Sequence, residues 1–92
     1  MYSKKVTILN KTGLHARPAS EFISMASKFK SRITIKKLGR DHEDPANAKS
    51  ILMLLSLALA QGTEVEITAK GEDEAEAVDA LVELVNSKFG EE

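Results

Sequence analysis

Residues 13–20 contain the side chains whose types and spacing best suit chemistry. The segment reads Gly13-Leu14-His15-Ala16-Arg17-Pro18-Ala19-Ser20, and apolar residues then recur every three or four positions. This period predicts a helix that begins close to His15. The first amides of a helix lack intrahelical acceptors and carry partial positive charge, so such a place binds anions, phosphate above all. Pro18 suits the first turn, where its missing N–H costs nothing.

His15 is the predicted reactive group of this segment. The positive end of the helix dipole and the Arg17 guanidinium both disfavour the imidazolium form, so we expect a neutral ring at about pH 7. A neutral ring nitrogen is a nucleophile, and a phosphoryl group on it would meet helix amides and the planar arginine fork. The residues therefore predict reversible phosphorylation of His15, with Arg17 stabilising the phosphate. The alternative is a histidine that caps the helix or has no role.

The composition argues against several other classes of protein. The 92 residues suit one domain over 1–92, with ordinary hydrophobic (42%) and charged (29%) fractions. A net charge of −1 gives no basis for direct nucleic-acid binding, and the absence of cysteine excludes thiolate chemistry. We expect no signal peptide, no insertion into a membrane and a cytoplasmic location.

The elements that must position His15 follow from the periodicity of the chain. Alternation predicts strands over residues 5–9, with Val6 and Ile8 inward, and over 32–36 and 64–69. Helical periods predict helices over about 16–28, 50–60 and 72–89, with Gly62 as the cap of the second helix. The third helix is expected to present one apolar face, formed by Ala75, Val78, Leu81, Val82, Val85 and Phe89.

Residues 38–48 are polar and rich in turn formers, and Pro45 lies where a strand residue would be needed. Proline is tolerated at a sheet edge or a strand start, so a strand here is expected to be very short or missing. The resulting order, β-α-β-(β)-α-β-α, favours an α/β (α+β) sandwich of two layers, in which helices cover one face of a sheet.

Two separate motifs resemble those of one known family. The segment from Gly13 to Ala19 resembles the phosphorylation-site signature of HPr, the histidine-containing phosphocarrier of the bacterial phosphoenolpyruvate:sugar phosphotransferase system. The family's regulatory-serine segment is similar to Asn47-Ala48-Lys49-Ser50-Ile51-Leu52, followed by Leu55-Ser56-Leu57 and Gln61-Gly62. The resemblance covers nearly the whole chain, although residues 39–48 run about four residues longer than the usual HPr pattern. It implies an open-faced sandwich with a four-stranded antiparallel sheet, ordered 1-4-2-3, under three helices.

The resemblance implies a phosphocarrier rather than an enzyme. Enzyme I, charged by phosphoenolpyruvate, would phosphorylate the δ1 nitrogen of His15, and sugar-specific IIA domains would receive the group. Ser50 would be modified by the HPr kinase/phosphorylase, and the seryl-phosphorylated protein would act as a partner of a catabolite-control transcription factor. The residues alone favour a helix-capping or first-turn serine at Ser50, and only the resemblance implies a regulatory site.

An exposed docking surface is expected near the two motifs. The run from Ile51 to Leu55 contains only apolar side chains, which cannot all point inward at helical spacing, so some must be exposed. The resemblance implies that they form, with the start of the first helix, the surface that meets Enzyme I and the IIA domains. The expected partner-binding residues are Ala16, Ser20, Ile51, Leu52 and Leu55.

No cofactor or metal is expected. His42 stands among acidic residues, but the spacing fits no zinc site or calcium loop, and the glycines are too scattered to form a nucleotide-binding loop. Three rival readings stay open. They are a regulatory HPr-like paralogue, whose known members lack the active histidine, a nitrogen-related phosphocarrier, and a small α/β binding domain in which His15 and Arg17 merely hold an anion.

Overall fold

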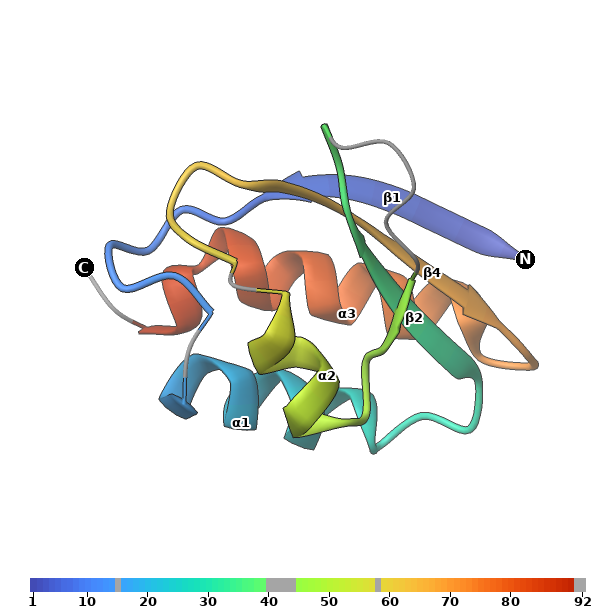
Figure 1. The fold of residues 1–92 in the computed structure, drawn as a ribbon. Coiled ribbons are helices and arrows are strands. Elements are labelled where there is room, and N and C mark those ends of the chain that lie inside the picture. Colours follow the sequence, from blue (N-terminus) through green and yellow to red (C-terminus); the bar gives the residue numbers. More distant parts are fainter. Residues whose placement is uncertain (15, 40–44, 58, 91–92) are drawn as a thin grey trace.

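The computed structural model describes residues 1–14, 16–39, 45–57 and 59–90. Its elements alternate between strands and helices in the predicted order (Figure 1). In chain order they are β1 (Tyr2–Thr7), α1 (Ala16–Ala26), β2 (Arg32–Lys37), β3 (Ala46–Asn47), α2 (Ile51–Ser56), β4 (Glu64–Lys70), α3 (Glu74–Asn86) and the short turn η1 (Lys88–Gly90).

The four strands form one antiparallel sheet in the order β1-β4-β2-β3. The central pairs set Val6 opposite Val65 and Ile35 opposite Ile67, so the inward faces of neighbouring strands are in register. The helices lie on one side of the sheet and leave the other side open (Figure 1). The predicted open-faced sandwich and its strand order are therefore confirmed.

The core lies between the sheet and the helices. Alternate residues of β2 and β4 are buried, as period-2 side chains on one face of a sheet must be. From the helices, Phe22 and Leu81 are fully buried, and each such side chain contributes about 2–3 kcal/mol of transfer free energy. The prediction for the third helix was wrong at Ala75, which is exposed, and right for Val78, Leu81 and Val85.

The third strand is present but contains two residues. Ala46 and Asn47 pair with Ile35 and Thr34 at the edge of the sheet, directly after Pro45. A proline at the start of an edge strand removes no ladder hydrogen bond from the sheet interior. The expectation of a shortened strand is therefore confirmed.

The second helix is shorter than the predicted range of 50–60. It ends at Ser56, whose hydroxyl donates to the Met53 carbonyl (2.7 Å) inside the last turn. The Leu59 carbonyl accepts a hydrogen bond from the Leu14 amide at 2.7 Å, and the Leu59 side chain is buried. Leu59 is therefore held against the turn before α1 and not in a continuation of the helix, which stops before its apolar run ends.

The first strand also has different bounds, since β1 covers residues 2–7 rather than 5–9. Ile8 follows the strand and is fully buried, as predicted, and its backbone pairs with the neighbouring connection. Its amide donates to the Thr63 carbonyl (2.9 Å), and its carbonyl accepts from the Gly62 amide (2.8 Å). Gly62 therefore belongs to this connection, and its predicted role as the cap of α2 was wrong.

The first and third helices end earlier than the periodicity suggested. The α1 helix ends at Ala26 rather than near residue 28, and α3 ends at Asn86. Lys88 and Phe89 then adopt left-handed backbone angles, with φ of 59° and 55°. Such angles are unfavourable for side chains larger than glycine, but here they turn Phe89 into the core, where it is buried.

Asp73, immediately before α3, joins this helix to the turn that follows α1. Its carboxylate accepts hydrogen bonds from the amides of Lys30 (2.9 Å) and Ser31 (3.0 Å), and from the Ser31 hydroxyl. These bonds, that from the Ser31 hydroxyl first, hold the pKa of Asp73 below its ordinary value. Gly71 packs so closely that an added Cβ would lie 2.6 Å from the Ser31 oxygen.

Asp73→Asn is expected to destabilise the protein in a pH-dependent manner. The NH₂ of the new side chain would face the amides of Lys30 and Ser31, which are themselves donors. A carboxylate with a lowered pKa stabilises the fold above its ordinary titration range and loses that contribution as pH falls. The difference in melting temperature between parent and variant should be largest near neutrality and should shrink from about pH 4 downward. Glu76→Gln, an exposed charge loss on α3, is the control. A gap that stays constant down to about pH 2 would contradict the role of the Asp73 charge.

Candidate functional site

The turn before α1 is built around Asn10, which is fully buried. Its side-chain amide donates to the Gly13 carbonyl (2.8 Å) and to the Thr12 hydroxyl (3.2 Å). The Gly13 amide donates in turn to the Asn10 carbonyl at 3.1 Å. Asparagine often closes turns through such local side-chain bonds. These bonds fix the course of the chain immediately before Leu14 and His15.

Gly13 brings this turn against a distant part of the chain. Its φ of +67° is a left-handed value that glycine adopts without strain. An added Cβ would lie 2.4 Å from the Leu59 carbonyl oxygen and 2.9 Å from Cα of Ala60. Glycine is therefore required both by backbone angle and by space, and the Leu14 amide bonds to Leu59 beside it.

His15 lies outside the described residues, so its predicted role stays a prediction. Its neighbours are described. Ala16 begins α1 and is exposed, and Pro18 is buried in the first turn, as predicted for that position. Arg17 is 85% exposed and lies 3.7 Å from a carboxylate oxygen of Glu21, one helical turn along. A pair this long and exposed holds the guanidinium weakly.

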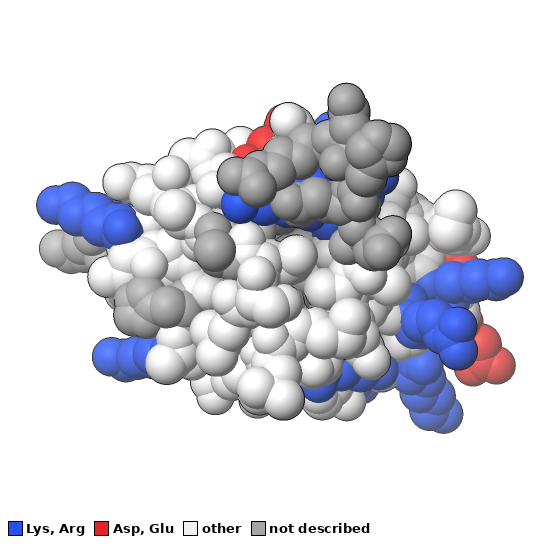
Figure 2. Space-filling view, in the orientation of Figure 1, with Lys and Arg blue, Asp and Glu red and all other residues white. Residues whose placement is uncertain are grey.

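The second helix exposes most of its apolar side chains. Ile51, Leu52, Met53 and Leu55 are all exposed, Leu52 by 78%, whereas Leu54 is buried. The expectation that some of Ile51, Leu52 and Leu55 are exposed is thus confirmed, since all three are, and Met53 is an addition. We call these four residues the α2 patch. The α2 helix packs on α1, where Ala16 and Ser20 are also exposed. Figure 2 shows this face largely uncharged, with Lys and Arg side chains projecting mainly from its margins.

Ser50 is the N-cap of α2, as its local sequence allowed. Its side-chain oxygen accepts a long hydrogen bond from the Met53 amide (3.4 Å), and the residue is half-buried. The preceding residue, Lys49, sends its ammonium group to the carbonyls of Phe29 (2.8 Å) and Ser31 (3.1 Å). Ser50 therefore lies at the edge of the α2 patch, on a segment that is fastened to the turn between α1 and β2.

Sequence reasoning missed several residues that hold this region together, namely Asn10, Lys37, Lys49 and Leu59. Lys37 donates from β2 to the Leu57 carbonyl at the end of α2 (3.3 Å). For Asn10, a signal existed, since Asn and Gly three residues apart favour a side-chain-closed turn. Lys37, Lys49 and Leu59 act through hydrogen bonds between a backbone carbonyl and a distant segment, which no local sequence pattern predicts.

Other candidate sites are less suited to chemistry. A groove of about 290 Å³ between α1 and α3 is lined by Met25, Ala80, Glu83, Leu84 and Ser87, which include a single ionisable group. Within the described residues, no three His, Cys, Asp or Glu side chains gather closely enough to hold a metal ion. His42, for which no metal role was predicted, lies outside that part of the chain. None of the described helices is long and apolar enough to cross a membrane.

Comparison with known proteins now decides the family. The family model "PTS HPr component phosphorylation site" matches residues 2–87 of this chain. The chain belongs to the HPr family. Its phosphocarrier relatives include the phosphocarrier protein HPr of Neisseria meningitidis, which is 44% identical over 91 residues, covering 99% of this chain and 98% of the relative.

Solved structures and a second type of relative refine this assignment. The crystal structure of HPr-C-His from Thermoanaerobacter tengcongensis is similar with a TM-score of 0.90 and 50% identity, covering 100% of this chain and 99% of the other. The HPr-like protein Crh of Bacillus subtilis is 44% identical over 88 residues, covering 96% of this chain and 99% of Crh. The HPr fold is thus shared along the whole chain, and both phosphocarriers and an HPr-like protein are among its relatives.

Gly13→Ala is expected to lower the free energy of unfolding by more than Gly62→Ala does. Both residues have left-handed φ angles, of +67° and +88°, but a Cβ on Gly62 would meet nothing within 4 Å. The left-handed conformation alone costs about 1–2 kcal/mol for alanine, and Gly13→Ala adds the collision with the Leu59 carbonyl. Urea unfolding of both variants measures the difference. Equal losses would show that the close approach of Gly13 does not constrain the turn.

Proposed function

We propose that this HPr-family protein accepts a phosphoryl group from Enzyme I on His15 and passes it to sugar-specific IIA domains. One observation carries the proposal: the HPr phosphorylation-site model matches residues 2–87, with Gly13-Leu14-His15-Ala16-Arg17-Pro18 at the motif. The geometry around the motif supports it. The turn before His15 is pinned by Asn10 and Gly13, and α1 follows at once.

The proposed transfer needs a nucleophile and a temporary place for charge. The δ1 nitrogen of His15 would form a bond to phosphorus while the bond between phosphorus and the Enzyme I donor breaks, and the reverse exchange would load a IIA domain. Arg17 is exposed and only weakly held by Glu21, so its guanidinium is free to turn toward phosphate oxygens. A weak, exposed contact between Arg17 and the phosphate suits a carrier, because the phosphoryl group must also be released to the next protein.

Partner docking is proposed for the surface formed by the start of α1 and the α2 patch. An exposed apolar area rimmed by charges is typical of a protein-binding surface. Ala16 and Ser20 are exposed on α1, and the α2 patch is exposed on the helix that packs against it. The positive margins seen in Figure 2 suit partners with acidic rims. The protein would occupy the same compartment as these partners, the cytoplasm.

Regulation is proposed at Ser50. Phosphorylation there by the HPr kinase/phosphorylase would add about −1.5 to −2 charges at the edge of the α2 patch. A partner with an acidic rim would then be repelled, and a catabolite-control transcription factor able to recognise the phosphate would be favoured. Because Ser50 is a cap residue outside the core, the change should alter partner choice rather than unfold the protein.

A regulatory HPr-like role is the second candidate, favoured by the similarity to Crh of Bacillus subtilis. In that case Ser50 would be the site that matters and His15 would not carry phosphate. The presence of a histidine at position 15, within an intact motif, argues for the carrier. The two candidates differ in one measurable property, the uptake of phosphate from Enzyme I.

Incubation with Enzyme I and labelled phosphoenolpyruvate is expected to give acid-labile label on the protein, because phosphohistidine is hydrolysed in acid. His15→Ala should remove the label entirely, and Arg17→Ala should slow its uptake without abolishing it. The second histidine of the chain, His42, provides the matched control, and His42→Ala should be labelled like the parent. An unlabelled parent, or a labelled His15→Ala, would sink the carrier proposal.

Incubation with ATP and the HPr kinase/phosphorylase is expected to give acid-stable label that Ser50→Ala lacks. Ser56 lies in the same helix with an exposed side chain, so Ser56→Ala is the control and should keep the label. The labelled protein should also accept phosphate from Enzyme I more slowly than the unlabelled one. If Ser50→Ala takes up as much label as the parent, the regulatory site is misassigned.

A further inference from the structure

The docking helix α2 has little of its own to hold it in place. It has six residues, and isolated helices of this length do not form in water. Only Leu54 among these six is buried, whereas the four residues of the α2 patch are exposed. Leu54 is thus the one fully buried side chain of α2, while Ile51, Met53 and Leu55, 39–42% exposed, bury only part of their surface. Polar contacts at the two ends of the helix add to this limited packing.

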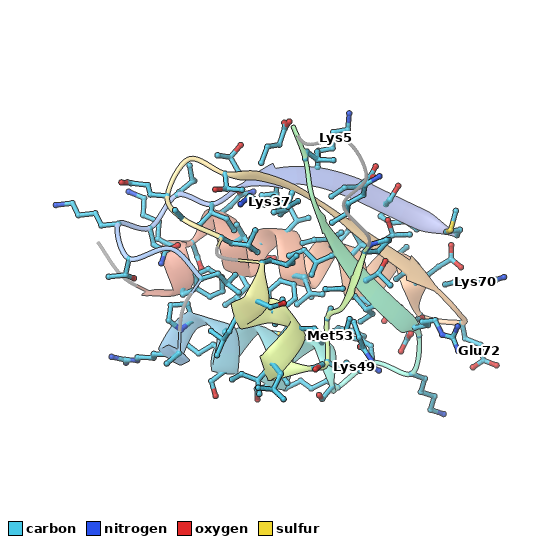
Figure 3. All side chains as sticks on the ribbon, in the orientation of Figure 1. Lys5, Lys37, Lys49, Met53, Lys70 and Glu72 are labelled. Atoms are coloured by element: carbon cyan, nitrogen blue, oxygen red, sulfur yellow. The ribbon has the colours of Figure 1, made fainter. Side chains whose placement is uncertain are left out.

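Lys37 contacts the end of this helix from the sheet. The residue lies at the last position of β2, and its ammonium group donates to the Leu57 carbonyl, 3.3 Å away, directly after Ser56. The last carbonyls of a helix lack intrahelical donors and carry partial negative charge, so a lysine there satisfies one acceptor and complements the dipole. Figure 3 shows Lys37 close to this end of α2.

Lys49 makes the corresponding contacts at the other end of α2, just before the helix begins. It directly precedes the cap residue Ser50, and its ammonium group donates to the Phe29 and Ser31 carbonyls in the turn after α1. The segment before α2 is thus fastened to the turn between α1 and β2, while Lys37 fastens the end of α2 to the sheet. In Figure 3 the two lysines lie toward opposite ends of α2, with Met53 between them.

We infer that Lys37 and Lys49 are positioning residues for partner docking, which hold the α2 patch in its binding-competent arrangement through three bonds to backbone carbonyls. The inference rests on the proposed docking of Enzyme I at this patch. Neither lysine is among the residues proposed to act at His15. Loss of the bonds of either lysine lowers the fraction of molecules in which α2 has its binding-competent arrangement. More of the partner's binding free energy is then needed to order the helix.

Lys37→Met and Lys49→Met test this inference, since methionine keeps an apolar stem and removes the donors. The KM of Enzyme I for each variant should rise about threefold to tenfold, the range that one net hydrogen bond covers, with kcat within about twofold of the parent. Lys37→Arg restores a charged donor and should bring KM back toward the parent value.

Two control variants each lose one lysine charge but keep the bonds that Lys37 and Lys49 make to backbone carbonyls. Lys36→Met lies next to Lys37, at a position opposite Glu66 in the sheet, and Lys30→Met lies in the turn that Lys49 contacts. Both controls should keep a KM close to that of the parent. If they raise KM as much as Lys37→Met and Lys49→Met do, net charge explains the effect and the positioning role is overturned. A fall in kcat with unchanged KM overturns it equally.

Amide exchange provides a readout that needs no partner. The Leu54 and Leu57 amides donate to the Ser50 and Leu54 carbonyls. Their exchange should be about threefold to tenfold faster in both variants, while the Ile67 amide in the sheet stays protected. Equal acceleration in helix and sheet would mean general destabilisation and would refute the inference, as would no acceleration. If the parent accepts no phosphate, the carrier proposal fails while this exchange test still decides the role of the lysines.

Discussion

The backbone contact of Gly13 and Leu14 with Leu59 and Ala60 is the constraint on which the rest of the region depends. It joins segments more than forty residues apart, with no side chain between them at Gly13. The Leu59 carbonyl bonds to the Leu14 amide, so the turn before α1 lies against a fixed segment of backbone that follows α2. The two motifs that resemble those of HPr thus become one structural unit through main-chain atoms.

This arrangement separates stability from recognition. The core is formed by the inward faces of the strands and by α1 and α3, whose buried side chains include Phe22 and Leu81. The α2 helix contributes Leu54 and presents the α2 patch outward. A carrier that meets several partners needs an apolar surface that is open yet ordered. Lysine contacts to backbone carbonyls can order such a surface without covering it.

Much of the fold was accessible from the sequence, because periodicity reports which residues are buried in each element. It identified the strand and helix order, the inward residues Val6, Ile8 and Val78, and the exposure on α2. It failed at the ends of elements and at Ala75, since a helical period does not determine how far round a helix the core extends. Periodicity also cannot report contacts between distant segments, such as that of Lys37 with the Leu57 carbonyl or that of Leu14 with Leu59. The strand order came from family resemblance rather than from the residues.

The two-residue length of β3 also affects how the protein behaves at high concentration. The edge of a sheet is a template on which a second chain can add a strand, and short edges offer few unpaired groups for this purpose. Ala46 and Asn47, preceded by Pro45, present such an abbreviated edge. A protein that must keep leucine and isoleucine side chains open to solvent is thereby protected at this edge from growing into sheet-like aggregates.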